Sequence, residues 1–151
     1  MNKTKVISAG LSATAVISIV ALMAPLMGMP KMDFGEMLGV NNPMMAMSYE
    51  MGWMMHFIVG IVLTAIYASF FVNKLKGSYA LRGVIFAMIP FVIAQAVMMP
   101  MMGAGFFSGG DVMMIMGSLI GHVVFGVVLG AVYKNGDSGI GIGEVVENEE
   151  V

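Results

Sequence analysis

The sequence has no cysteine, few charged residues and only two histidines among its 151 residues. The absence of cysteine excludes disulfides, thiolate metal sites and cysteine nucleophiles. Charged residues make up 11% of the chain, and they show no acid–base pair, no Ser-His-Asp spacing and no phosphate-binding loop, so we expect no enzyme. No basic patch is present either, which argues against nucleic-acid binding.

What the chain does contain is apolar. Hydrophobic residues make up 59% of it, and its mean hydropathy is +0.92. A soluble domain of this length could not keep so much apolar surface out of water, so the sequence predicts a protein surrounded by a lipid bilayer.

Four runs without a charged residue divide the chain. They hold 25, 23, 28 and 22 residues and lie between Lys5 and Lys31, Glu50 and Lys74, Arg82 and Asp111, and Asp111 and Lys134. A helix needs about 20 apolar residues to cross a membrane. We therefore predict an all-α membrane protein with four transmembrane helices near residues 6–29, 51–72, 83–102 and 113–133.

The cations set the expected orientation. Six of the seven Lys and Arg residues fall on one side of the predicted spans, and only Lys31 falls on the other. Positive loops stay in the cytoplasm, so we expect both termini inside, in the inner (plasma) membrane. Residues 1–134 form the transmembrane domain, and residues 135–151, Gly-rich and then acidic, are expected to be a disordered cytoplasmic tail.

The two halves of the transmembrane domain resemble each other. The end of the first predicted helix reads ALMAPLMG (21–28) and the end of the third reads AVMMPMMG (96–103), while the second and fourth share MMHFIVGIVLTAIY (54–67) and IGHVVFGVVLGAVY (120–133). The chain therefore reads as two tandem hairpins, repeat 1 at about 6–73 and repeat 2 at about 80–134. Each hairpin crosses the membrane twice, so the repeats are parallel.

A matched stripe follows one face of the second and fourth predicted helices. In sequence order it reads Gly52, His56, Gly60, Thr64, Tyr67 and Ser118, His122, Gly126, Gly130, Tyr133. Steps of four, four, four and three residues keep these side chains on one face of a helix. His56 and His122 should then lie at similar depth, and they face each other if the two helices flank the axis that relates the repeats.

These segments also carry a family resemblance, through APLMGMPKMDFGEMLG, GWMMHFIVGIVLTAIY, LRGVIFAM, MPMMGAGFF and HVVFGVVLGAVY. From about Gly10 to Tyr133 the chain resembles an uncharacterised family of small bacterial and archaeal membrane proteins. That family carries only a label for a domain of unknown function. The resemblance implies the four-helix architecture and no particular chemistry.

Two interpretations of the stripe compete. Small residues allow helices to approach closely, GVVLG (126–130) is a G-x-x-x-G motif, and the two Tyr residues fall where an interfacial belt is expected, so the stripe can be a packing seam. Alternatively, His56 and His122 ligate a b-type haem, with Gly60 and Gly126 leaving room for the ring. Only Lys31 lies near enough to pair a propionate.

Methionine supports another hypothesis. All methionines except Met1 and Met88 lie in the predicted outer half or outer loops. Thioethers and imidazoles are ligands for Cu(I), so an outward Met and His surface could bind Cu(I) or Ag(I). Met also fills apolar gaps freely, which explains the same pattern without a metal. The candidate thioethers are Met54, Met55, Met98, Met99, Met101 and Met102.

Transport is the remaining class, because ionisable groups inside a membrane are candidates for function. His56 and His122 are the clear ones, and Gln95 adds one polar group. Four helices make a thin transporter or channel unless the chain forms a homo-oligomer. The sequence favours a non-enzymatic accessory or scaffold subunit, alone as a homo-oligomer or within a larger membrane complex, with a possible site at the two histidines.

Overall fold

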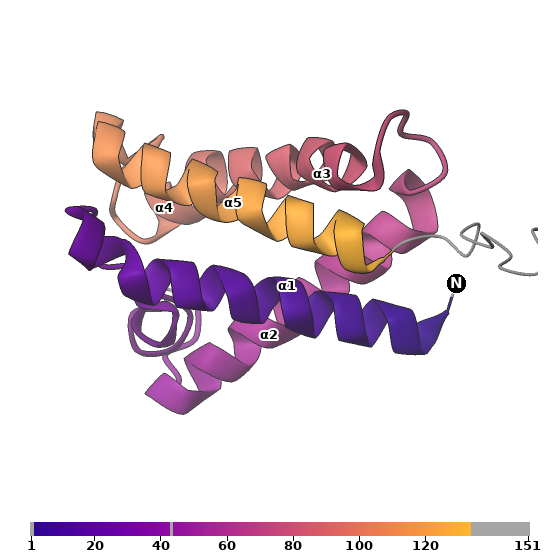
Figure 1. Ribbon diagram of the computed structural model, residues 1–151. Coiled ribbons are helices and arrows are strands. Elements are labelled where there is room, and N and C mark those ends of the chain that lie inside the picture. The colour runs from indigo at the N-terminus through magenta and orange to yellow at the C-terminus, as the bar shows by residue number, and fades with distance from the viewer. Residues whose placement is uncertain (1, 43, 134–151) are drawn as a thin grey trace, which may run out of the picture.

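Four long helices make up the part of the chain that the computed structural model describes, residues 2–42 and 44–133 (Figure 1). Each is long and apolar enough to cross a membrane, and these described residues form no strand. The spans are Lys3–Met27, Tyr49–Phe71, Tyr79–Met101 and Val112–Val132. The prediction of four helices long and apolar enough to cross a membrane is confirmed, with ends shifted by a few residues. The predicted tail, 135–151, lies outside the described residues.

Polar residues set where the helices begin. Asn2, Ser48, Ser78 and Asp111 precede α1 (Lys3–Met23), α2 (Tyr49–Ile66), α3 (Tyr79–Ile93) and α5 (Val112–Val132), and each side chain accepts a hydrogen bond from a backbone N–H of the first turn. Such caps satisfy donors that a helix start leaves without partners.

The ends of the spans depart from α-helix. A 3₁₀ turn at Ala24–Met27 ends the first span, and π-helical turns at Tyr67–Phe71 and Ala94–Met98 continue the second and third. A short helix, α4 (Met99–Met101), completes the third span. Gly28 and Gly103 then turn the chain with φ of +76° and +79°, a conformation that favours glycine.

The helices pack in the order α2, α1, α5, α3. The contact between α3 and α5 is the most extensive, followed by those of α1 with α5 and with α2. In Figure 1, α1 and α5 run side by side while α2 crosses behind them. The segment Tyr67–Phe71 meets α3 at one end of the bundle, but α2 does not pack along α3. The second and fourth spans therefore do not flank a central axis; the α1–α5 pair forms the centre of the bundle.

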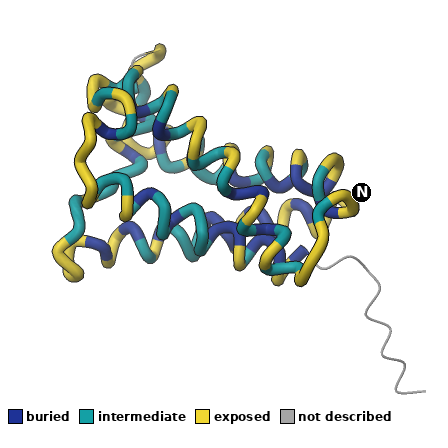
Figure 2. Tube along the Cα trace, turned by 90° about the horizontal axis from the view of Figure 1, so that it is seen from above, coloured by how far each residue is buried: buried dark blue, intermediate teal, exposed yellow. Residues whose placement is uncertain are grey.

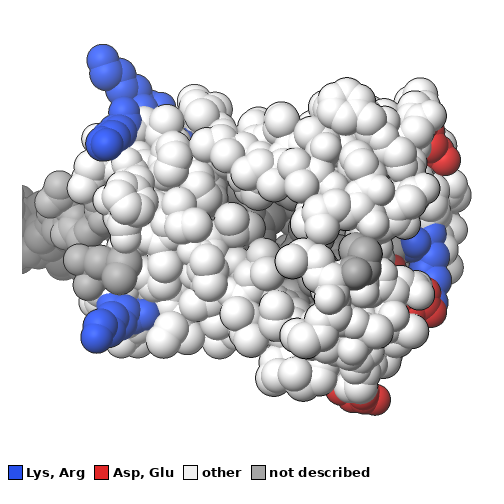
Figure 3. Space-filling view, turned by 180° about the vertical axis from the view of Figure 1, so that it is seen from behind, with Lys and Arg blue, Asp and Glu red and all other residues white. Residues whose placement is uncertain are grey.

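Charge separates the two ends of the bundle, as the space-filling view shows (Figure 3). By their positions along the chain, the residues of what we call the basic end are Lys3, Lys74, Lys76 and Arg82, and those of the acidic end are Lys31, Asp33, Glu36, Glu50 and Asp111. The tightly packed core lies toward the basic end and includes Tyr67, Phe86 and Leu129. Figure 2 shows buried residues on the facing sides of the helices and exposed ones on the turns and outer faces.

Glycines allow the backbones of α3 and α5 to approach each other closely. A Cβ added at Gly126 would lie 2.6 Å from the carbonyl oxygen of Gly83 and 2.7 Å from Cα of Val84. At Gly130 it would meet the backbone of Tyr79 and Ala80. The G-x-x-x-G motif predicted from the sequence is therefore a helix-packing motif, and its partner surface is the start of α3.

Candidate functional site

A cavity of about 190 Å³ lies in the half of the bundle nearer the acidic end. Its walls come from α1, α2, α5 and the Ala94–Met102 segment. Residues 29–38, between the first two spans, also line it, and we call them the covering segment. Seen from behind, the molecule is hollowed between the side of α3 and the side of α2 (Figure 3). The cavity exists because α2 and α3 separate beyond the basic end, whereas the other neighbouring helices stay in contact.

His56 reaches this cavity from α2. Its ring stacks on Phe34, with ring centroids 3.8 Å apart and planes 10° from parallel, and Trp53 meets it edge-on at 6.0 Å. Its Nε2 is buried and has no hydrogen-bond partner. Phe34 belongs to the covering segment, so the stack fastens that segment to α2.

His122 reaches the same cavity from α5. Its Nδ1 lies 2.8 Å from the carbonyl oxygen of Ser118. Because a carbonyl oxygen can only accept a hydrogen bond, Nδ1 is the donor and carries the proton of the neutral ring. The lone pair of His122 then resides on Nε2. Both histidines named from the sequence thus line one cavity, although α2 and α5 do not pack along each other.

Six methionines line the same cavity as the two imidazoles. Three come from the covering segment and three from the end of the third span: Met29, Met32, Met37, Met98, Met99 and Met102. Of the six named from the sequence, Met98, Met99 and Met102 line the cavity. Met54 and Met101 are 49% and 41% exposed on the outer surface, and neither they nor Met55 line it.

The two glycines predicted to leave room for a ligand have different surroundings. Gly60 lines the cavity and faces Thr14 of α1, whose hydroxyl is buried without a partner. Gly126 does not line it, because its surface packs against the backbone of Gly83. The assignment of Gly126 to the site is therefore corrected: equal spacing on two helices does not give them equal neighbours.

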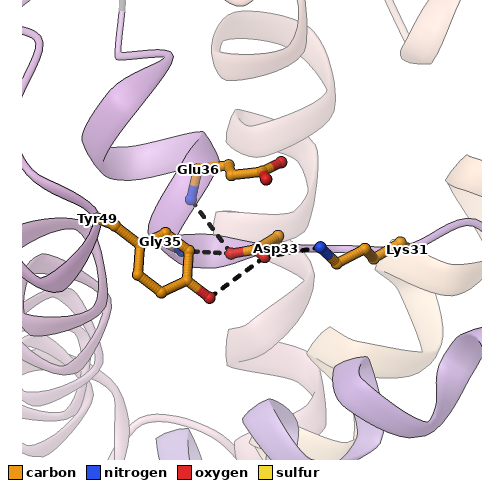
Figure 4. Close-up of polar contacts among 5 residues, drawn as sticks. All are labelled: Lys31, Asp33, Gly35, Glu36 and Tyr49. Atoms are coloured by element: carbon orange, nitrogen blue, oxygen red, sulfur yellow. Dashed lines mark hydrogen bonds and ion pairs between the residues drawn. The ribbon is translucent and has the colours of Figure 1, made fainter.

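Asp33 holds the covering segment in place (Figure 4). Its Oδ1 accepts hydrogen bonds from the backbone N–H of Gly35 at 3.0 Å and of Glu36 at 3.2 Å. Its Oδ2 accepts one from the Tyr49 hydroxyl at 3.3 Å and pairs with Nζ of Lys31 at 3.0 Å. Partial burial raises the pKa of Asp33, but these hydrogen bonds outweigh it and hold the pKa below its usual value.

We expect Asp33→Ala to loosen the covering segment. The change removes four interactions, and losing a helix cap alone costs about 1 kcal/mol. A cysteine introduced as Met37→Cys, in a chain that has no other, should then react faster with a water-soluble maleimide. Asp33→Asn is the control, since its amide oxygen can still cap the two N–H groups. Equal labelling rates in all three proteins would contradict this role.

Comparison with known proteins gives a family and no function. The sequence model of a family of unknown function, DUF6789, matches residues 2–138. No curated protein matches the chain, and no solved structure does.

Proposed function

The chain belongs to the DUF6789 family of unknown function, and we propose that it is a non-enzymatic integral membrane protein that shelters a small ligand in its cavity. The observation that carries this is the convergence of His56 and His122, from helices that do not pack along each other, on one cavity. Ionisable groups within membrane spans are costly and mark functional sites. The unpartnered hydroxyl of Thr14 adds a third polar group at the same place.

The size of the cavity favours a ligand smaller than haem. A cavity of about 150 Å³ holds one benzene ring, so the 190 Å³ found here suits a ligand of that size rather than four pyrroles. Phe34 already covers one face of His56, and Lys31, the cation predicted to pair a propionate, is paired with Asp33. Haem stays a prediction from the sequence, and the geometry favours a smaller occupant.

The proposal is tested by identifying any small molecule or ion that the purified protein retains. Full-length protein extracted gently from its native membrane would be examined by visible absorption, elemental analysis and mass spectrometry of an organic extract. Ala94→Phe, on the cavity wall, should lose the retained species, whereas Val97→Phe, on the exposed surface of the same segment, should keep it. If nothing is retained, or if both variants retain it equally, the proposal is wrong.

An assembly role, as a homo-oligomer or a subunit of a larger membrane complex, is the second candidate. One observation favours it: an apolar groove of about 230 Å³ lies between α2 and α3. The groove is nearer to the basic end than the cavity is. Leu63 lines both the groove and the cavity. Crosslinking of full-length protein in native membranes would test this role.

We also propose that the basic end is cytoplasmic and that the two hairpins are parallel repeats. The first part rests on the positive-inside rule. For the second, the matched turns at Gly28 and Gly103 share nearly the same φ, and the matched rings of Tyr67 and Tyr133 meet with centroids 6.0 Å apart.

The orientation predicts a labelling pattern. In intact cells, a cysteine placed as Met45→Cys, at the acidic end, should react with a membrane-impermeant maleimide. A cysteine placed as Lys76→Cys, at the basic end, should react only after the membrane is permeabilised. The reverse pattern would show that the basic end faces outward.

A further inference from the structure

The geometry points to a monovalent soft metal ion, Cu(I) or its analogue Ag(I), as the ligand of the cavity. This inference rests on the proposed function and names its ligand. It changes the site expected from sequence, since the thioethers concerned line a cavity with both imidazoles instead of an outward surface. The donors come from four parts of the chain that only the folded protein brings together: α2, α5, the covering segment and the end of the third span.

His122 is oriented as a metal-binding imidazole. Its Nδ1–H donates to the carbonyl of Ser118, which leaves the Nε2 lone pair available. Histidines that bind metals almost always donate their other ring N–H in this way, because the hydrogen bond fixes the tautomer and the ring orientation. His56 brings a second imidazole to the cavity, with its Nε2 buried and without a hydrogen-bond partner.

Thioethers approach from two sides. Met29 and Met32 lie over α5: a Cβ added at Gly117 would lie 3.9 Å from Sδ of Met29 and 2.8 Å from Cε of Met32. Met98 and Met102 line the cavity from the end of the third span. The cavity that His122 lines is therefore lined by thioether side chains both from the covering segment and from the end of the third span.

The donor types select the class of ion. Thioether sulfur is soft and favours Cu(I), whereas Mg²⁺ and Ca²⁺ require oxygen ligands. No Asp or Glu lines the cavity, and nowhere in residues 2–42 and 44–133 do three or more His, Cys, Asp or Glu side chains gather as a metal site. Imidazole and thioether donors are neutral, so they do not compensate the charge of a bound ion. Burying an uncompensated charge costs free energy, and the cost is lower for a monovalent ion than for a divalent one.

The test uses full-length protein in lipid nanodiscs, titrated with Ag(I), or with Cu(I) under anaerobic reducing conditions against a Cu(I)-specific chelator. Trp53, the only tryptophan, lies edge-on to His56 and provides a fluorescence signal near the site. Met98→Leu/Met102→Leu removes two cavity thioethers while conserving apolar volume. Met54→Leu/Met101→Leu, outside the cavity, is the matched control.

We expect one tightly bound ion in the wild type and in the control. The cavity pair should bind at least about tenfold more weakly, and His122→Leu more weakly still. Equal affinity in the two methionine pairs would overturn the site, as would a greater loss in the control. If the wild type binds neither ion but retains an organic molecule that Ala94→Phe loses, the metal inference fails and the proposed function stands. If it binds neither ion and retains nothing, both fail.

Discussion

Gly126→Leu is expected to prevent native packing of the bundle. Any side chain at this position is directed at the backbone of α3, at the carbonyl of Gly83 and Cα of Val84. Backbone atoms cannot rotate away as a flexible side chain can, so α3 and α5 must separate. Overpacking in a core costs about 1–3 kcal/mol, and here it acts on the most extensive helix contact. We expect a loss of about 3 kcal/mol or more.

The measurement is the free energy of unfolding in mixed micelles, followed by helix content as denaturing detergent is added. Val127→Leu is the control, because it adds volume one residue away on a surface that is 41% exposed. Gly121→Ala is a second control: its Cβ would meet only the side chain of Ile17, at 3.1 Å. If Gly126→Leu had the same free energy of unfolding as these two controls, α3 and α5 would not be in close backbone contact at this position.

The sequence predicted the spans well because charge is rare in this chain. A helix that must cross the bilayer leaves an uncharged run, and four such runs gave four helices. The third span begins at Tyr79 and not at the predicted residue 83, because the charge of Arg82 does not mark the boundary. Its guanidinium donates to the carbonyls of Gly77 and Val72, so the charge is accommodated within the first turn.

The site was only partly predictable, for a geometric reason. Spacing along a helix shows which residues share a face, and the histidines of the two matched faces line one cavity. It does not show which neighbour that face meets, and Gly126 turned out to pack on α3. Met29, Met32 and Met37 lie outside the long helices, where periodicity gives no direction.

What turns those three methionines toward the cavity is a set of local interactions. Asp33 caps the turn that follows it and bonds to Tyr49, and Phe34 stacks on His56. Gly35 also permits close contact with the rings of Tyr49 and Trp53. Apart from the Asp33 cap, each of these contacts joins residues that are far apart in the sequence. The methionines of this segment are visible in the sequence, but the position of the segment over the two histidines is not.

The matched tyrosines were expected in an interfacial belt, and the structure places them in the core. Tyr67 is fully buried, with Phe86 at 5.3 Å and Tyr133 at 6.0 Å between ring centroids. The reason is that the π-helical turn Tyr67–Phe71 brings this part of the second span against α3. The ring therefore fills the basic end of the bundle, while the same two helices diverge toward the histidines.

This position gives the second prediction of large effect. Tyr67→Ala should lower the free energy of unfolding by about 3–5 kcal/mol, the usual cost of deleting a buried aromatic ring. Tyr67→Phe should be neutral or slightly stabilising, because the hydroxyl is buried without a hydrogen-bond partner and its removal relieves that cost. Both are measured by unfolding in mixed micelles, beside the wild type. A loss of more than about 1 kcal/mol in Tyr67→Phe would mean that the hydroxyl bonds to a buried water, since a paired hydroxyl contributes about that much.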